Sequence, residues 1–332
     1  MQYIDASMVG SMGAEASASI GIVETTVWLL GSICSATAAG FYVQVSHQLG
    51  ADDGPQARDT LRQGIVSVLA VSMILSLTAL AVSPFLPVWL GGNADINASA
   101  SAYFAIIAMG IPAFQFSIFG SGMLRSSGNM VVPSVMSVVM MSLDVVFNSF
   151  LIFPTRTVSI LGTAFTMPGA GLSVEGAAIG TVSAECIAAS ITMYLLCFRH
   201  GELSLRRRPG RFRPTRRVLG KALHISLPMG LQQGIMCSAY VATTLIIAPL
   251  GTFAIAANSF GIIIESLCYM PGYGIADAAT TLVGQSLGAA RHELMKRFAW
   301  LSVLLGMAVM AVMGVVMYVG APFAMSLMTP VS

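Results

Sequence analysis

Long apolar runs separated by short polar segments extend from one end of the chain to the other. Each run is about as long as the roughly 20 residues that an α-helix needs to cross the hydrocarbon core of a bilayer. The pattern predicts eight complete membrane-spanning helices, preceded by the end of another at residues 1–11. The eight lie near residues 16–46, 61–90, 99–124, 131–153, 176–198, 218–249, 252–287 and 295–328. We therefore expect an all-α, polytopic membrane protein.

Composition agrees with this reading and narrows the functional classes. Of the 332 residues, 56% are hydrophobic and only 9% are charged, whereas soluble domains carry roughly 25% charged residues. An intramembrane enzyme would need a catalytic constellation, but the sequence contains neither an H-E-x-x-H nor a G-x-S-x-G motif. We therefore expect no enzyme.

Basic residues indicate the orientation in the membrane. If residues 1–11 end outside, fifteen of the sixteen Lys and Arg residues fall on the cytoplasmic side and only Arg156 falls outside. Such an excess marks the cytoplasmic loops of membrane proteins. The densest patch, residues 205–217, has seven Arg. A nucleic-acid-binding arm is one reading of this patch, but a cytoplasmic loop touching anionic lipid already accounts for its charge, and we expect no nucleic-acid partner.

The chain contains an internal repeat whose two copies differ in residue number by a constant offset of 238. The matching pairs are Met12–Ala18 with Leu250–Ala256, Val45–Ala51 with Val283–Ala289, Arg58 with Lys296, and Pro84-Phe85 with Pro322-Phe323. Six spans separate the copies, an even number, so both copies insert with the same topology. This predicts two lobes related by a pseudo-two-fold axis along the membrane normal, the parallel type of repeat found in many transporters.

The repeat also predicts the domain organisation. We expect a first lobe at residues 1–199, a basic cytoplasmic linker at 200–217 and a second lobe at 218–332. Subtracting 238 from 332 gives 94, so the second copy holds no match to residues 95–199. We therefore expect a first lobe that is nearly complete and a second lobe that lacks about three helices of a twelve-span parent.

Two polar residues stand out in the apolar span at 131–153. Asp144 and Asn148 are four residues apart and so lie on one face of a helix. An acid at the centre of a membrane-spanning helix costs roughly 2.5–3.5 kcal/mol or more, so it is expected to face a polar cavity and to have a function there. Thr181 is expected near the same depth, where its hydroxyl either satisfies a backbone carbonyl or points into that cavity. The small-xxx-small pair Gly176 and Gly180 predicts close helix packing.

Other intramembrane polar residues leave alternatives open. Gln232 and Gln233 could bind substrate or join two helices by hydrogen bonds. Glu24, Glu185 and Glu265 could be functional or structural. We expect the segment 154–173 to be an external loop, and Pro271-Gly272 to break its helix and open a cavity in the second lobe.

Several segments together resemble the multidrug and toxic compound extrusion (MATE) transporters, in particular their DNA-damage-inducible-F-like bacterial branch. They are YIDASMVGSMG, LRSSGNMVVP, DVVFNSFLIF, VEGAAIGT, SLPMGLQQ and ESLCYMPGYGIADAATTLVGQSLGA. The resemblance implies a two-lobed exporter of the bacterial cytoplasmic membrane that acts as a monomer. It also implies exchange of cationic, amphipathic drugs or toxins for Na⁺ or H⁺, with membrane lipid around the protein and no cofactor beyond the coupling ion.

The resemblance implies a cation or proton site in the first lobe at Asp5, Asp144, Asn148 and Thr181. The order on the fifth helix is reversed here, because Asp144 stands where the family has Asn and Asn148 where it has Asp. Two nearby carboxylates in a low-dielectric cavity cannot both ionise cheaply, so the pair could hold a proton, or a Na⁺ with Asn148 and Thr181 as further ligands. In the second lobe, Gln232, Gln233 and Glu265 are candidate substrate or polar sites.

Two other functions stay open. A flippase of the same superfamily, for lipids or lipid-linked oligosaccharides, would be expected to carry Lys or Arg inside its cavity, but no basic residue falls in the interior of a predicted span, away from its first few residues. The chain could also be a fragment that does not transport by itself.

Overall fold

The computed structural model of the chain describes residues 8, 14–90, 94–160, 163–199, 201–205, 210, 212–247 and 252–328. Its long helices coincide with the eight predicted spans. They are α2 (Ala14–Gly50), α3 (Gly54–Val82), α5 (Ala94–Ser126), α6 (Val131–Leu151), α7 (Ser173–Tyr194), α8 (Arg216–Ile247), α9 (Thr252–Gly288) and α10 (His292–Met328). A short helix, α4 (Leu86–Trp89), follows α3, and one π-helical turn, η1 (Leu195–Arg199), extends α7. The predicted all-α fold class is confirmed.

The helices have the character of membrane spans. Among the described residues, six helices contain stretches long and apolar enough to cross a bilayer: those in α2, α3, α5, α6, α7 with η1, and α10. Apolar side chains are exposed on their surfaces, with Trp300 69%, Met307 65% and Tyr318 87% exposed on α10. A helix apolar on its outer surface is stable in lipid and not in water. Helices α8 and α9 are 32 and 37 residues long, and their crossing of the membrane stays a prediction.

The internal repeat is confirmed to the residue. Helices α2 and α9 each have 37 residues, and their bounds differ by 252 − 14 and 288 − 50, both 238. The following helices begin at Gly54 and His292, which keep the same offset. The connecting turns also agree, because Asp52 and Ala290 are equivalent positions and both have a left-handed backbone, with φ of 58° and 56°. The two copies therefore share the conformation of this loop and the length of the helix before it.

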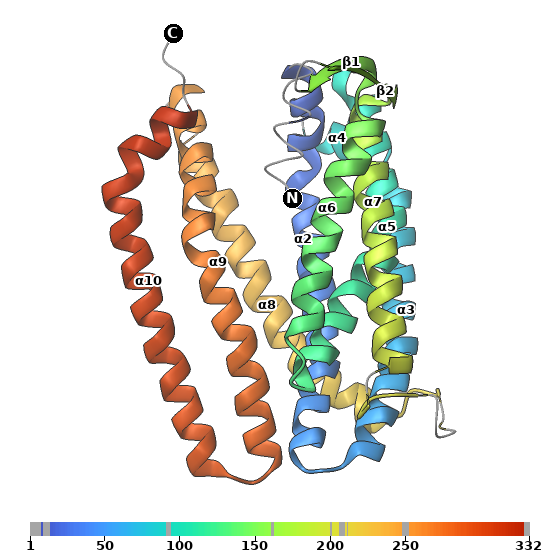
Figure 1. The fold of residues 1–332 in the computed structure, drawn as a ribbon, viewed down its shortest axis with the longest axis vertical. Coiled ribbons are helices and arrows are strands. Elements are labelled where there is room, and N and C mark those ends of the chain that lie inside the picture. The colour runs from blue at the N-terminus through green and yellow to red at the C-terminus, as the bar shows by residue number, and fades with distance from the viewer. Residues whose placement is uncertain are drawn as a thin grey trace.

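Figure 1 shows two groups of helices that meet at the end where the α2–α3 and α9–α10 turns lie and separate toward the other end. The first group contains α2, α3, α5, α6 and α7, and the second contains α8, α9 and α10. One hydrophobic core joins the first group to the start of α8, with Phe41, Leu61, Phe119, Val218 and Ala222 among its members. Helices α3 and α10 begin and α5 ends at the joined end, so Arg58, Arg125 and Lys296 lie there, whereas β1, which contains Arg156, lies at the opposite end (Figure 1). Under the predicted orientation, the joined end is the cytoplasmic one.

Glycines allow the two copies to touch at this cytoplasmic end. A Cβ added to Gly50 would lie 2.0 Å from the carbonyl oxygen of Gln285, and one added to Gly288 would lie 1.9 Å from that of His47. Since His47 and Gln285 are themselves equivalent positions of the repeat, the same contact occurs twice about the pseudo-two-fold axis. Any larger side chain at either glycine would push α2 and α9 apart.

Polar contacts close the same end. Arg125 at the end of α5 forms an ion pair with Asp277 on α9. The amide of Gln285 donates to the carbonyl oxygen of Ser126 at 2.8 Å, and the Ser46 hydroxyl donates to that of Thr281 at 3.1 Å. These contacts hold the two helix groups together on the cytoplasmic side.

Two sequence expectations were wrong in detail. Segment 154–173 was expected to be a loop, but most of it forms an antiparallel hairpin of β1 (Pro154–Ile160) and β2 (Thr163–Ala170). Its β-branched residues favour extended backbone, and Gly169 admits the close approach of the strand to the Phe153 carbonyl, 2.1 Å from an added Cβ. The break expected at Pro271-Gly272 is also absent, because α9 runs through Pro271 without interruption.

Candidate functional site

Helix α6 buries its acid and its amide and exposes many of its apolar residues. Asp144 and Asn148 are fully buried, whereas Val138 and Val146 on the same helix are 64% and 47% exposed. In water this pattern would be unstable, but in lipid it places the acid inside the protein. The polar cavity expected beside Asp144 stays a prediction.

The carboxylate of Asp144 accepts two hydrogen bonds at one oxygen. The hydroxyl of Thr181 on α7 donates to Oδ1 at 3.0 Å, and the amide of Asn148, one turn along α6, donates to the same oxygen at 3.3 Å. The structure therefore brings together three of the four residues predicted for the first-lobe site. Of the two possibilities for the Thr181 hydroxyl, it takes the one that points to the acid.

Glycines on α7 allow this arrangement. A Cβ added to Gly180 would lie 2.1 Å from Oδ1 of Asn148, and one added to Gly176 would lie 2.5 Å from the carbonyl oxygen of Leu151. The predicted close packing at the small-xxx-small pair is present. Gly180 also makes room for the candidate site, because the side-chain amide of Asn148 occupies the space that a larger residue at position 180 would fill.

A second acid, Glu185, lies one turn after Thr181 on α7 and is only 7% exposed. Its carboxyl group is hydrogen-bonded by the side chain of Ser117 on α5 and lies near enough to Asp144 for the two charges to interact. The sequence analysis left the role of Glu185 open. The spacing of four residues from Thr181, which places both on one face of α7, is the signal that could have assigned it to this site.

The second-lobe candidates lie apart from Asp144, and the fourth first-lobe candidate is not among the described residues. Asp5 lies outside the described residues, although Met8 packs against the outer ends of α6 and α7 at Ile152 and Val174. Gln232 and Glu265 are exposed on α8 and α9, and Gln233 is partly buried. Glu265 has Tyr240 of α8 within electrostatic range. In the described part of the chain, these residues form no common cluster with the first-lobe site.

The chemistry of the described site is that of one carboxylate with amide and hydroxyl neighbours. Among the described residues, no three of His, Cys, Asp and Glu are grouped so that they could hold a metal ion. A transition-metal centre would need such a group. A proton on Asp144, or an alkali cation held by carboxylate, amide and hydroxyl oxygens, fits the residues that are present.

Secondary transporters commonly combine a helix bundle, an internal repeat and a buried polar site. This chain has all three features, with the buried Asp144 between α6 and α7. The comparisons identify the family: the chain belongs to the MatE family, whose model matches residues 1–150 and 228–331. Family membership supports the prediction of a transporter rather than an enzyme, and of a multi-pass protein of the bacterial inner membrane.

Individual relatives are distant but extensive. The chain is 24% identical over 289 residues to a "Probable multidrug resistance protein NorM" of Thermotoga maritima, covering 87% of this chain and 59% of that protein. It is 25% identical over 300 residues to an "FAD transporter" of Shewanella oneidensis, covering 90% and 63%. The solved structure "Crystal structure of MATE in complex with MaL6" has a TM-score of 0.88 at 21% identity, covering 100% of this chain and 70% of that chain.

These comparisons limit what carries over to this protein. The structural likeness shows the fold, and the chain spans about three fifths of the length of the two relatives. The expected loss of about three helices and the assignment to the DNA-damage-inducible-F-like branch both stay predictions.

Proposed function

We propose that this protein takes part in secondary active multidrug efflux, exchanging cationic, amphipathic compounds for H⁺ or Na⁺ at a site centred on Asp144. The observation that carries the proposal is the fully buried Asp144 carboxyl group, which accepts hydrogen bonds from α6 and α7 in a membrane-spanning bundle. The names of the multidrug relatives support the class of cargo.

The free energies of burial and hydrogen bonding favour a carboxyl group that readily gains and loses a cation. Placing an ionised carboxyl group at the centre of a membrane-spanning helix costs roughly 2.5–3.5 kcal/mol. Each hydrogen bond to a charged group returns about 1.5–3 kcal/mol, and Asp144 accepts two. The opposing contributions are of similar size, so a small change around the site is enough to load or release a cation.

Coupling follows if a coupling ion and a cationic drug compete for the same negative charge. Each then shifts the balance between an outward-open and an inward-open arrangement of the lobes, and the two effects are reciprocal. The closed cytoplasmic end described above supports assigning this structure to a state closed toward the cytoplasm.

The choice between Na⁺ and H⁺ depends on the amide of Asn148. In the present arrangement its NH₂ group faces Asp144, which suits a proton or an empty site. A Na⁺ would need an oxygen there, so the amide would have to turn. Sodium coupling therefore requires a rearrangement of Asn148 that proton coupling does not.

A flippase would be expected to have a fixed positive charge in the membrane interior. Arg62, near the start of α3, is the one buried Arg among the residues whose burial is described. Its guanidinium group forms an ion pair with Asp59, with an N–O distance of 2.7 Å. That location is the cytoplasmic end and not the centre of the bundle. The buried acid at Asp144 favours cationic cargo instead.

The test measures cation exchange directly, without requiring transport. Ethidium is added to the purified chain in weakly buffered detergent solution, and proton release is recorded together with binding. Wild type is expected to release protons on binding, Asp144→Asn is expected to release none, and Asp52→Asn, an exposed loop acid, serves as the matched control. Equal release by wild type and Asp144→Asn would contradict the proposal. Ethidium efflux from cells expressing the same variants, under separate Na⁺ and pH gradients, then tests transport and identifies the coupling ion.

A further inference from the structure

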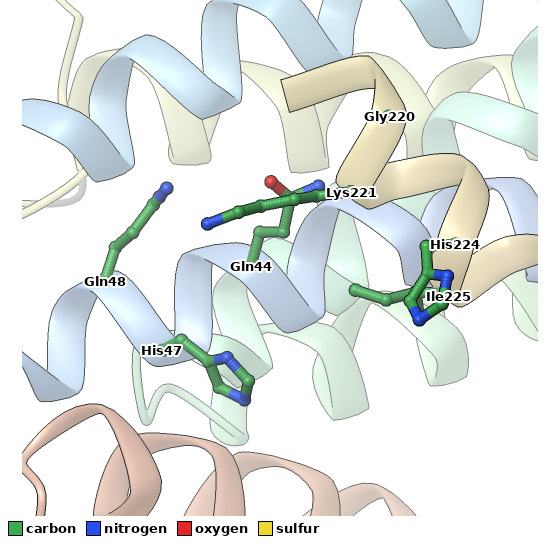
Figure 2. A pocket seen from close by; sticks show the side chains of 7 residues that line it. All are labelled: Gln44, His47, Gln48, Gly220, Lys221, His224 and Ile225. Carbon is green, nitrogen blue, oxygen red and sulfur yellow. The ribbon is translucent and has the colours of Figure 1, made fainter. Parts of the chain in front are cut away.

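A cavity of about 510 Å³ lies between the end of α2 and the start of α8, away from the Asp144 site. Its lining is Gln44, His47, Gln48, Gly220, Lys221, His224 and Ile225. Figure 2 shows the side chains of Gln44, Gln48 and Lys221 directed into one space, with His47 and His224 beside it. A volume of this size falls within the range of small-molecule sites.

The charge of the cavity selects an anion. Its ionisable lining residues are one Lys and two His, and no acid belongs to the lining. His47 and Lys221 lie close enough for the ammonium charge to act on the imidazole, and Lys221 forms no ion pair within the described part of the chain. A cationic drug would meet only like charge here, whereas an anion would relieve the repulsion.

The two amides indicate what else the ligand carries. Gln44 is 5% exposed; its NH₂ group donates to the carbonyl oxygens of Gly40 at 2.8 Å and Val218 at 3.2 Å. Its Oε1 atom, and that of Gln48 one turn along α2, are buried and accept no hydrogen bond from any described residue. Buried acceptors are normally satisfied. Because both side chains line the cavity, a rotation of each amide would present its Oε1 atom to a ligand that carries hydroxyl groups.

The position of the cavity points to the inner leaflet. It lies at the cytoplasmic ends of α2 and α8 under the predicted orientation, and α8 begins there with the basic residues Arg216 and Arg217. Lys221 and His224 are exposed on α8, so the cavity is open on that side. Basic pockets between membrane helices at this depth suit anionic lipid headgroups.

We propose that this cavity is a binding site for a phosphate ester bearing free hydroxyl groups, of the kind found in the headgroup of phosphatidylglycerol. Lys221 and the two imidazoles bind the phosphate, and the hydroxyl groups donate to Gln44 and Gln48. Because α2 and α8 belong to different lobes, the bound headgroup bridges the lobes on the cytoplasmic side.

The experiment uses the full chain in nanodiscs and native mass spectrometry to count retained lipids. In mixed phosphatidylglycerol and phosphatidylcholine, wild type is expected to retain phosphatidylglycerol preferentially, and Lys221→Gln to lower that retention about tenfold because a charge-assisted contact is lost. Lys296→Gln is the matched control, since this Lys near the start of α10 is 64% exposed and lies at the same end. Gln48→Leu is expected to reduce the preference for phosphatidylglycerol over phosphatidic acid, which lacks the headgroup hydroxyls.

Competition separates the two sources of the ligand. Soluble glycerol phosphate that displaces the lipid from wild type and not from Lys221→Gln would identify a soluble ester as an alternative occupant of the same site. Failure to displace would assign the site to lipid. Equal phosphatidylglycerol retention by wild type and Lys221→Gln would overturn the proposal. Equal retention of phosphatidylglycerol and phosphatidylcholine by wild type would overturn it as well.

Discussion

Replacing Gly180 by alanine tests whether the candidate site depends on the close approach of α6 and α7. An alanine Cβ would lie 2.1 Å from Oδ1 of Asn148, whereas ordinary van der Waals contact begins at 3.4 Å and real Cβ atoms essentially never come closer than 3.0 Å. Either the helices separate or the Asn148 amide moves until the contact is normal. Overpacking of this kind typically costs about 1–3 kcal/mol.

The assay is thermal unfolding of the purified chain, followed by size-exclusion chromatography after heating. For a chain of 332 residues, an unfolding entropy of about 2.1 cal/mol/K per residue converts a loss of about 2 kcal/mol into a fall in midpoint of about 3 °C. Gly21→Ala on α2 is the matched control: nothing lies within 4 Å of its added Cβ, so it is expected to be neutral or to stabilise by about 0.5–1 kcal/mol through helix propensity.

Cation binding distinguishes the two ways of relieving the clash. If the Asn148 amide moves, Gly180→Ala weakens the proton release that accompanies ethidium binding. If α6 and α7 separate instead, the main effect of Gly180→Ala is a loss of thermal stability. A variant equal to wild type in both stability and proton release would refute the close approach.

Three further predictions concern neighbouring groups. Thr181→Val removes one donor to Asp144 and is expected to weaken ethidium-linked proton release about tenfold, measured by titration; Thr181→Ser should restore it, and equal weakening by both would assign the residue to packing. Glu185→Gln is expected to shift the pH dependence of ethidium binding, because it removes a charge beside Asp144; an unchanged pH profile would exclude Glu185 from the site. For the partly exposed pair Arg125 and Asp277, a double-mutant cycle on thermal stability should give a coupling of about 0.5–1 kcal/mol, and zero coupling would contradict an ion pair between the lobes.

Sequence reasoning predicted the helices and the repeat because both leave strong one-dimensional signals. A bilayer requires an apolar run of roughly fixed length, so hydropathy located seven of the eight long helices to within five residues at each end. Helix α3 begins seven residues and ends eight residues before the expected bounds of 61–90, and the short α4 was not expected. The constant offset appeared in short identical stretches and then proved to hold for helix ends and for the left-handed turn residues Asp52 and Ala290. Asp144 and Asn148 were identified because polar groups are rare in such runs.

Features that depend on contacts between distant segments could not be predicted in the same way. The reciprocal contacts of Gly50 and Gly288 involve backbone atoms of the other copy, which no local pattern reveals. Glu185 was one of several intramembrane acids; its spacing of four residues from Thr181 pointed to the site, but its burial against α5, in contrast to exposed Glu265, became visible only in the structure. The hairpin was missed because the expected loop was judged by its position between spans and not by its β-branched residues.

Infrared difference spectroscopy of the purified chain tests the central claim most directly, namely that the buried acid on α6 exchanges a small cation for cargo. Spectra are recorded while pH or Na⁺ is stepped and again on adding ethidium. The account predicts that the carbonyl band of a protonated carboxyl group disappears when ethidium binds, and that this band is missing in Asp144→Asn. An identical difference spectrum in Asp144→Asn would contradict the claim.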